Sequence, residues 1–372
     1  MLQGGGNTQG IGRVFRNALA ANASVAVLLT AVMYTVYCFV DKLGQPEELL
    51  PHIRPYFVLQ LISLLFIMLF NGFRQFAEGL TDTRTPMWIL LGGNALNIFG
   101  NYLLIYGSFG FPEWGLFGAG VSTLVSRIVM LLVFIGVVAV ARRYKVYREA
   151  ILRSRFNRND FMQLNALGWP IALQMGMETA AFSLSAIMVG WLGSIPLAAH
   201  QIMISVSTIG FMVYYGMGAA LAVRVSHFMG QKDFPNLRRA VNSGMGIILS
   251  LAIVASLFFY LARTPIIYSF TEDHEVMIVV SSLIFSLIVY QFGDALQITF
   301  ANALRGTTDV KPMMWIAFFS YFIVALPVGY LCGFTWGGGV VGVWVAFPAG
   351  LFTAGFLFWL RFRYRLQQLM KK

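Results

Sequence analysis

The segment GWPIALQMGMETAAFSLSAIMVGWLG (Gly168–Gly193) is an almost unbroken apolar run whose one ionisable residue, Glu178, lies near its middle. A membrane-spanning helix needs about 20 apolar residues, so this segment predicts a span. A charge at mid-bilayer costs about 2.5–3.5 kcal/mol on insertion scales, and such residues commonly mark ion or substrate pathways. The segment therefore predicts both the class of the protein and one residue of its functional site.

Apolar segments of similar length recur along the whole chain. Of the 372 residues, 58% are hydrophobic and 11% are charged, whereas about a quarter of the residues of a soluble domain are charged. The runs are continuous and do not alternate, which favours helices over a barrel. We therefore predict an all-α membrane protein with ten transmembrane helices: Ala18–Val40, Tyr56–Phe73, Met87–Tyr106, Leu116–Val140, Gly168–Leu192, Leu197–Val223, Val241–Leu261, Val276–Phe300, Met313–Leu331 and Val340–Leu360.

The basic residues are distributed unequally between the two sides of the membrane. When the connecting segments are assigned alternately to the two sides, 22 of the 26 Lys and Arg, Arg305 among them, fall on the side that holds both termini. Cytoplasmic loops carry such an excess, so we expect both termini in the cytoplasm. The net charge of +11 then faces the membrane surface, and nucleic acid is not expected as a partner.

A weak internal repeat divides the chain into two lobes. FRQFAEGLTDTRTPM (Phe73–Met87) resembles FANALRGTTDVKPMM (Phe300–Met314), with Asp82 matching Asp309. We predict a four-helix N-lobe in residues 1–140, a basic cytoplasmic linker in 141–160 and a six-helix C-lobe in 161–372. The unequal halves lead us to expect that two further N-terminal helices are missing. Lobes of six helices would share one orientation in the membrane.

Only three charged residues lie well inside a predicted span: Arg127, Glu178 and Asp294. Gln174 lies one helical turn before Glu178, and both Tyr290 and Gln291 lie one turn before Asp294. Residues three or four apart share a helix face, so each acid belongs to a polar stripe.

We predict that these five residues, Glu178, Asp294, Tyr290, Gln291 and Gln174, bind the cation or substrate, with Glu178 and Asp294 as possible Na⁺ ligands. A buried acid can exchange a proton, a metal cation and an organic cation. The alternative is a structural role, in which interhelical hydrogen bonds satisfy the acids. For Arg127, pairing with carbonyls or an acid and snorkelling to the cytoplasm both remain open.

The quoted repeat segment Phe73–Met87, together with GNALNIFGNYLLIYG (Gly93–Gly107), AAHQI (Ala198–Ile202) and GMGAALAVRVSHFMGQKD (Gly216–Asp233), resembles the multidrug and toxic compound extrusion (MATE) family, in its NorM-type branch. The resemblance implies twelve helices in two bundles and, because this branch is bacterial, a place in the bacterial inner membrane. It also implies export of organic cations in exchange for Na⁺ or H⁺ by alternating access. Acids in the first and fourth helices of the second lobe bind cations in that branch, and these match Glu178 and Asp294.

The favoured function is thus a secondary antiporter that exports organic cations and drugs. A flippase for lipid-linked oligosaccharides and an inactive truncated transporter remain alternatives, and a membrane-embedded enzyme is the third class. We expect no enzymatic activity and no cofactor apart from the coupling ion, because the sequence has no metal-spaced His cluster and no phosphate-binding Gly/Lys loop. The expected partners are organic cations and membrane lipid, and we expect a monomer. The choice between Na⁺ and H⁺ stays open.

Overall fold

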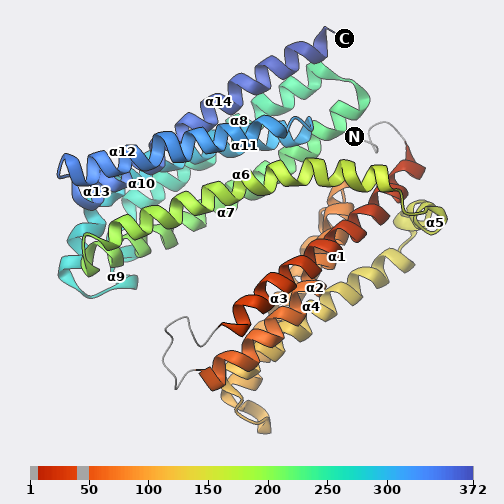
Figure 1. Cartoon of the computed structure of the whole chain (residues 1–372), viewed down its shortest axis with the longest axis horizontal. Coiled ribbons are helices and arrows are strands. Elements are labelled where there is room, and N and C mark those ends of the chain that lie inside the picture. The colour runs from red at the N-terminus through yellow and green to blue at the C-terminus, as the bar shows by residue number, and fades with distance from the viewer. Residues whose placement is uncertain (1–6, 40–49, 372) are drawn as a thin grey trace. The chain divides into compact units, whose positions relative to one another are not determined.

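The computed structural model describes residues 7–39 and 50–371. Within these ranges every regular element is a helix, and ten helices are long and apolar enough to cross a membrane. The predicted all-α membrane fold is therefore confirmed. The chain divides into two compact units, one ending at Asn165 and the other beginning at Ala166 (Figure 1).

The helices of the first unit contain the first four predicted spans. They are α1 (Thr8–Cys38), α2 (Leu50–Gly79), α3 (Arg84–Tyr106), α4 (Gly115–Val140), the short α5 (Lys145–Arg153) and the start of α6 (Arg158–Gly190), with 3₁₀ turns at Ser108–Gly110 and Arg142–Tyr144. Val40, the predicted end of the first span, lies outside the described residues.

An aromatic core holds the first unit together. Phe15 of α1 stacks on Phe76 of α2 with ring centroids 4.2 Å apart, and Phe70 meets Phe134 of α4 edge-on at 5.8 Å. The predicted linker contains α5, and this helix packs tightly against α1. A Cβ atom at Gly12 would lie 2.6 Å from the backbone of Ala150, so this contact requires glycine.

The second unit contains the remainder of α6 and all the later helices. These are α7 (Ser194–Gln231), α8 (Phe234–Leu261), α9 (Arg263–Phe270), α10 (His274–Gly306), α11 (Lys311–Phe318), α12 (Leu326–Tyr330), α13 (Gly339–Trp344) and α14 (Ala346–Met370). Each of the six later predicted spans overlaps one or more of these helices.

The predicted span Met313–Leu331 is less regular than expected. π-helical stretches at Phe319–Ala325 and Leu331–Thr335 flank α12. Pro327 lies in α12. Its ring has no N–H donor and would clash with the carbonyl four residues earlier in an α-helix, so the preceding turn widens. Hydropathy predicts the length of a span but not this local change of helix type.

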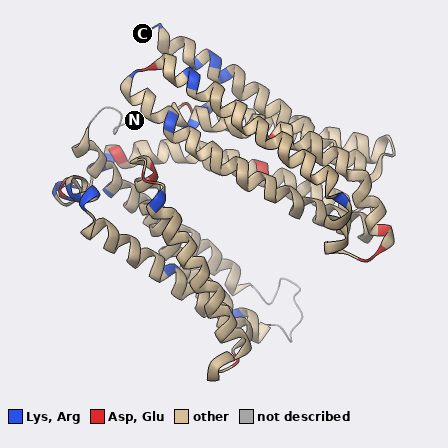
Figure 2. Ribbon diagram, turned by 180° about the vertical axis from the view of Figure 1, so that it is seen from behind, with Lys and Arg blue, Asp and Glu red and all other residues tan. Residues whose placement is uncertain are grey.

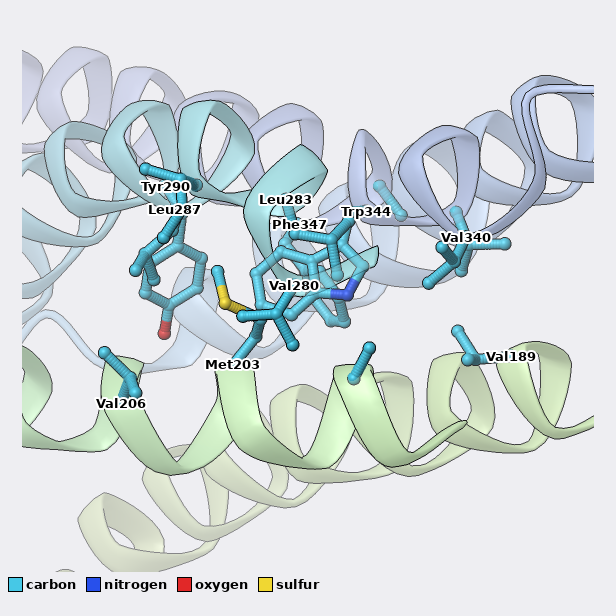
Figure 3. Close-up of a cluster of buried hydrophobic side chains, with 14 of the residues drawn as sticks. Val189, Met203, Val206, Val280, Leu283, Leu287, Tyr290, Val340, Trp344 and Phe347 are labelled. Atoms are coloured by element: carbon cyan, nitrogen blue, oxygen red, sulfur yellow. The ribbon is translucent and has the colours of Figure 1, made fainter. Parts of the chain in front are cut away.

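α10 is the central helix of the second unit. It packs against α7, α8 and α14, and residues on all sides of its C-terminal half are buried. Figure 3 shows Leu283, Leu287 and Tyr290 of this helix facing Met203 and Val206 of α7. A side chain carried by α10 is therefore held rigidly, which suits a binding site.

The sequence repeat is also a repeat of backbone geometry. Thr81 and Thr308 both take the left-handed conformation, with φ of 62° and 56°. The next residues, Asp82 and Asp309, each donate their N–H to the carbonyl five residues earlier, at 2.9 and 3.1 Å. Both carboxylates then bind a basic residue from a later helix or turn. Arg361 forms two hydrogen bonds with Asp309, at 2.6 and 3.0 Å.

Asp82 is held by three neighbours outside the membrane spans. The Tyr144 hydroxyl donates to its carboxylate at 2.5 Å, the Thr85 N–H donates at 3.2 Å, and Arg143 forms an ion pair. Partial burial alone would raise the pKa of Asp82, but these donors outweigh it and hold the pKa well below its ordinary value. Burial and the bond to Asp82 raise the pKa of Tyr144 to about 12.

Charge is unevenly distributed within the second unit. Lys and Arg gather at the end where α7 and α14 finish, and they are nearly absent from the helix middles (Figure 2). The opposite end carries Arg263 beside three acids, Glu272, Asp273 and Glu275. The asymmetry agrees with the charge bias seen in the sequence.

Asp82→Asn should lower the free energy of unfolding at pH 7 by about 1–3 kcal/mol, because the hydrogen bonds to a charged acceptor are weakened. A carboxyl whose pKa is lowered by folding stabilises the protein above its ordinary pKa of about 4. That contribution fades as the pH falls towards the lowered folded value, so wild type and variant should converge in acid. Unfolding in detergent across this pH range measures both effects.

Glu149→Gln is the matched control, since Glu149 is exposed on the neighbouring α5. A surface change of this kind should alter stability by less than about 0.5 kcal/mol. Equal stability of wild type and Asp82→Asn at pH 7 would show that the contacts of the Asp82 carboxylate with Tyr144, Thr85 and Arg143 contribute nothing to the free energy of unfolding.

Candidate functional site

The second unit contains a cavity of about 280 Å³ between α6, α7 and α10. Its polar lining consists of Gln174, Glu178, Thr179, Ser207, Thr208, Gln297, Asn302 and Arg305. Its aromatic lining consists of Phe182, Phe211, Tyr215 and Tyr290. An aromatic wall with a few polar groups and one carboxylate suits a flat organic cation.

Glu178 projects from α6 into this cavity and is only half-buried. Its Oε2 atom accepts a hydrogen bond from Gln174 at 3.0 Å and another from Gln297 of α10 at 3.1 Å. Gln297 also approaches the Tyr321 hydroxyl at 3.4 Å. These bonds orient the carboxylate through one of its oxygens, and the Tyr321 hydroxyl forms a further hydrogen bond with the same carboxylate.

Arg305 is the charged residue nearest to this network that the sequence analysis did not place in it. It was assigned to the cytoplasmic side, but α10 continues to Gly306 and Arg305 lines the cavity. Its Nη2 atom donates to Gln174 Oε1 at 2.8 Å. Gln174 therefore bridges Arg305 and Glu178, and the positive charge acts on the carboxylate without a direct ion pair.

The spacing of polar residues along α10 could have predicted that Arg305 belongs to this network. Asp294, Gln297 and Arg305 are separated by three and eight residues, so they fall near one helix face. The predicted span ends at Phe300 because hydropathy drops there, although α10 and its polar stripe continue to Gly306. The helix carries the stripe one and a half turns beyond the apolar run.

Asp294 does not line the cavity. It is 1% exposed, and its Oδ2 atom has no hydrogen-bond partner among the described residues. The charge of Glu178 still acts on it through the interior of the unit. A buried carboxylate without a donor is costly unless it takes up a proton or a cation. Asp294 therefore has the chemistry of an ion-exchanging group behind the cavity wall.

Tyr290 and Gln291, one helical turn before Asp294 on α10, have different surroundings. Tyr290 lines the cavity, and its ring meets Phe182 edge-on at 6.3 Å. Gln291 is fully buried, and neither of its amide atoms has a partner within the described part of the chain. Its side chain packs on Gly210 of α7, where a Cβ atom would lie 2.6 Å from Gln291 Oε1.

The structure thus brings Gln174, Glu178 and Tyr290 to one cavity and places Asp294 and Gln291 behind its wall. Helical periodicity groups residues on one helix face, but the packing of α7 over α10 determines which of them reach the cavity. Among the described residues, no group of three or more His, Cys, Asp and Glu side chains is arranged to hold a metal ion. The Glu178 carboxylate is nevertheless suitable for a hard monovalent cation or a proton, whereas the Gln174 oxygen accepts from Arg305.

Comparison with known proteins places these features in a family. The MatE family model matches residues 2–103 and 170–331. The multidrug resistance protein PmpM of Pseudomonas aeruginosa is 34% identical over 96% of this chain and 76% of its own length. The multidrug resistance protein NorM of Photobacterium profundum is 31% identical over 91% of this chain and 75% of its own length. The family expected from the sequence motifs is confirmed.

A solved structure of similar fold is a variant of the MATE transporter VcmN of Vibrio cholerae. It superposes with a TM-score of 0.81, covers 100% of this chain and 87% of its own chain, and is 17% identical in sequence. At that identity the likeness shows the fold.

The cavity geometry predicts a contrast in chemical accessibility between two threonines. Thr208 lines the cavity, whereas Thr299 of α10 is completely buried. With Cys38 and Cys332 replaced by alanine, Thr208→Cys should react with a water-soluble thiol reagent at least about tenfold faster than Thr299→Cys, because only the first side chain meets open space. Labelling rates followed by mass spectrometry measure the contrast, and equal rates would contradict the assigned cavity.

Proposed function

The chain belongs to the MATE family of multi-pass membrane transporters, and we propose that it exports organic cations and drugs in exchange for Na⁺ or H⁺ by alternating access. The observation that carries the proposal is the placement of Glu178, a half-buried carboxylate in an aromatic cavity at the middle of a membrane span. The bacterial relatives named above are multidrug resistance proteins, which supports the same class of cargo.

In this proposal Glu178 binds the positively charged ligand directly. Gln174 and Gln297 orient its carboxylate, and the ring of Tyr290 contributes to the apolar wall against which a flat cation stacks. An organic cation is stabilised by the Glu178 carboxylate only when the coupling ion is not bound to that carboxylate. Two positive ligands therefore compete for one negative charge, which is the basis of exchange.

Asp294 serves as the second acid of the proposed mechanism. It lies behind the wall, where it is too enclosed for a large organic cation but open in principle to a proton or Na⁺. Because the charge of Glu178 acts on Asp294, loading one acid changes the affinity of the other for a cation. Gln291 and the Tyr214 hydroxyl, which also have no partner among the described residues, supply polar atoms along the same buried region.

Exchange can drive export only if the inward-facing and outward-facing states bind the coupling ion with different affinities. The coupling ion must bind one state more tightly than the other, and a ligand of equal affinity for both states shifts nothing. Arg305 offers a physical source of that difference, because its field weakens or strengthens with any change in the Gln174 bridge. We further propose that the protein lies in the bacterial inner membrane, as the bacterial relatives suggest, and that both termini are in the cytoplasm, on the strength of the charge bias.

Replacing either acid tests the proposal. Glu178→Gln and Asp294→Asn should each abolish efflux of a fluorescent organic cation, because the neutral amide cannot hold the coupling ion. Efflux from cells and the amount of protein inserted in the membrane are measured together, and insertion should be unchanged. Normal efflux from both variants would reject the antiport assignment.

Glu275→Gln provides the matched control, since Glu275 is an exposed acid at the start of the same helix, α10. Its efflux should equal that of wild type. Imposing a Na⁺ gradient at constant pH, and then a pH gradient without Na⁺, identifies the coupling ion.

A further inference from the structure

Among the residues of the first unit that the structure describes, one charged side chain lies deep in a span: Arg127 of α4. It is the thirteenth of the 26 residues of this helix. With a rise of about 1.5 Å per residue, its Cα lies roughly 18–20 Å from either helix end. An arginine at such a position normally extends its side chain to the nearest water.

Hydrogen bonds prevent that extension here. Arg127 Nη1 donates to Gln60 Oε1 at 3.3 Å and to the Ser63 hydroxyl. Gln60 and Ser63 are the eleventh and fourteenth of the 30 residues of α2, so they also lie near its middle. The guanidinium is therefore held at mid-membrane depth by α2. Of the two alternatives for Arg127, these contacts favour pairing over snorkelling, and the partners are one amide carbonyl and one hydroxyl, with no acid among them.

These neighbours are neutral, and the unit supplies no anion at that depth. The described acids of the first unit lie near the ends of long helices, between helices or in the short α5: Glu78, Asp82, Glu113, Glu149 and Asp160. None of them forms an ion pair with Arg127. A charge in a span without a counter-ion is costly, so its retention at this site needs a functional explanation.

The remaining donors of Arg127 are available. Its Nε and Nη2 atoms make no hydrogen bond with a described residue, and neither is among the fully buried polar atoms. A guanidinium presents paired N–H groups that match the two oxygens of a carboxylate or a phosphate. One turn earlier on α4, the Thr123 hydroxyl lies 3.3 Å from the Asn97 amide, so the polar face continues beside it.

We propose that Arg127 forms an oxyanion-binding subsite that receives the carboxylate of an amphoteric organic cation. Depth favours a solute over a lipid headgroup, since phosphates lie at the surface of a hydrocarbon core about 30 Å thick. The two acids within the spans of the second unit have contacts inside that unit. Glu178 accepts bonds from Gln174 and Gln297, and Asp294 is buried. The proposal rests on the proposed function in one respect only: the carboxylate is taken to belong to a transported organic cation.

Equilibrium binding to the purified protein tests the subsite without requiring transport. The two probes are a carboxyrhodamine, which carries a delocalised cation and a carboxylate, and its ethyl ester, which keeps the cation alone. Arg127→Gln should weaken binding of the acid at least about tenfold and leave binding of the ester within about twofold. Arg127→Lys, which keeps the charge but loses the paired donors, should fall between wild type and Arg127→Gln for the acid.

Arg142→Gln is the matched control, because it removes the same charge at an exposed position just after α4. It should change binding of neither probe. Equal losses for the two probes in Arg127→Gln, or no loss for either, would overturn the proposal and leave Arg127 a structural residue.

Two further measurements separate the remaining explanations. If lipid phosphate occupies the site, the effect of Arg127→Gln will follow the phosphatidylglycerol content of nanodiscs and will not distinguish acid from ester, which also overturns the proposal. Failure of the antiport mechanism would appear differently, as ester efflux that is insensitive to Glu178→Gln, while the selectivity of Arg127 for the acid would persist in the binding measurement.

Discussion

The scarcity of water inside the bilayer governs this structure. A charge or polar group within a span must find a partner in the protein, because lipid offers none. Of the few charged side chains at depth, Arg127 is held by Gln60 and Ser63, and Glu178 is held by Gln174 and Gln297. Glutamine and serine orient the charge without neutralising it. Each unit therefore keeps a charge available for a ligand, negative in one and positive in the other.

The elements of the fold were largely predictable from the chain alone. Lipid-length apolar runs located all ten spans, because the thickness of the membrane fixes the length of a helix that crosses it. The paired Gly/Thr/Asp turns located the repeat, since both copies keep the same residue types at matching positions. The packing of α5 on α1 was not predictable, because a basic, polar composition indicates exposure to water and says nothing about a contact such as that between Gly12 and Ala150.

The candidate site was predictable in part, for a related reason. Helical spacing assigned Asp294 and Gln291 to a polar face, but it cannot show how closely another helix covers that face. Gly210 permits α7 to approach Gln291, and the two residues become enclosed. Arg305 was missed because its span was ended at the last apolar residue. Hydropathy marks where lipid stops, whereas a helix and its polar stripe continue for as long as hydrogen bonds and packing support them.

The left-handed threonines carry a practical consequence for protein engineering. A β-branched residue in this conformation is strained by about 1 kcal/mol or more, whereas asparagine enters it readily. Thr81 and Thr308 occupy such corners in both halves of the repeat. The two positions are therefore natural starting points for a more heat-tolerant form of the protein suited to crystallisation, since relief of strain at either corner leaves the membrane interior untouched.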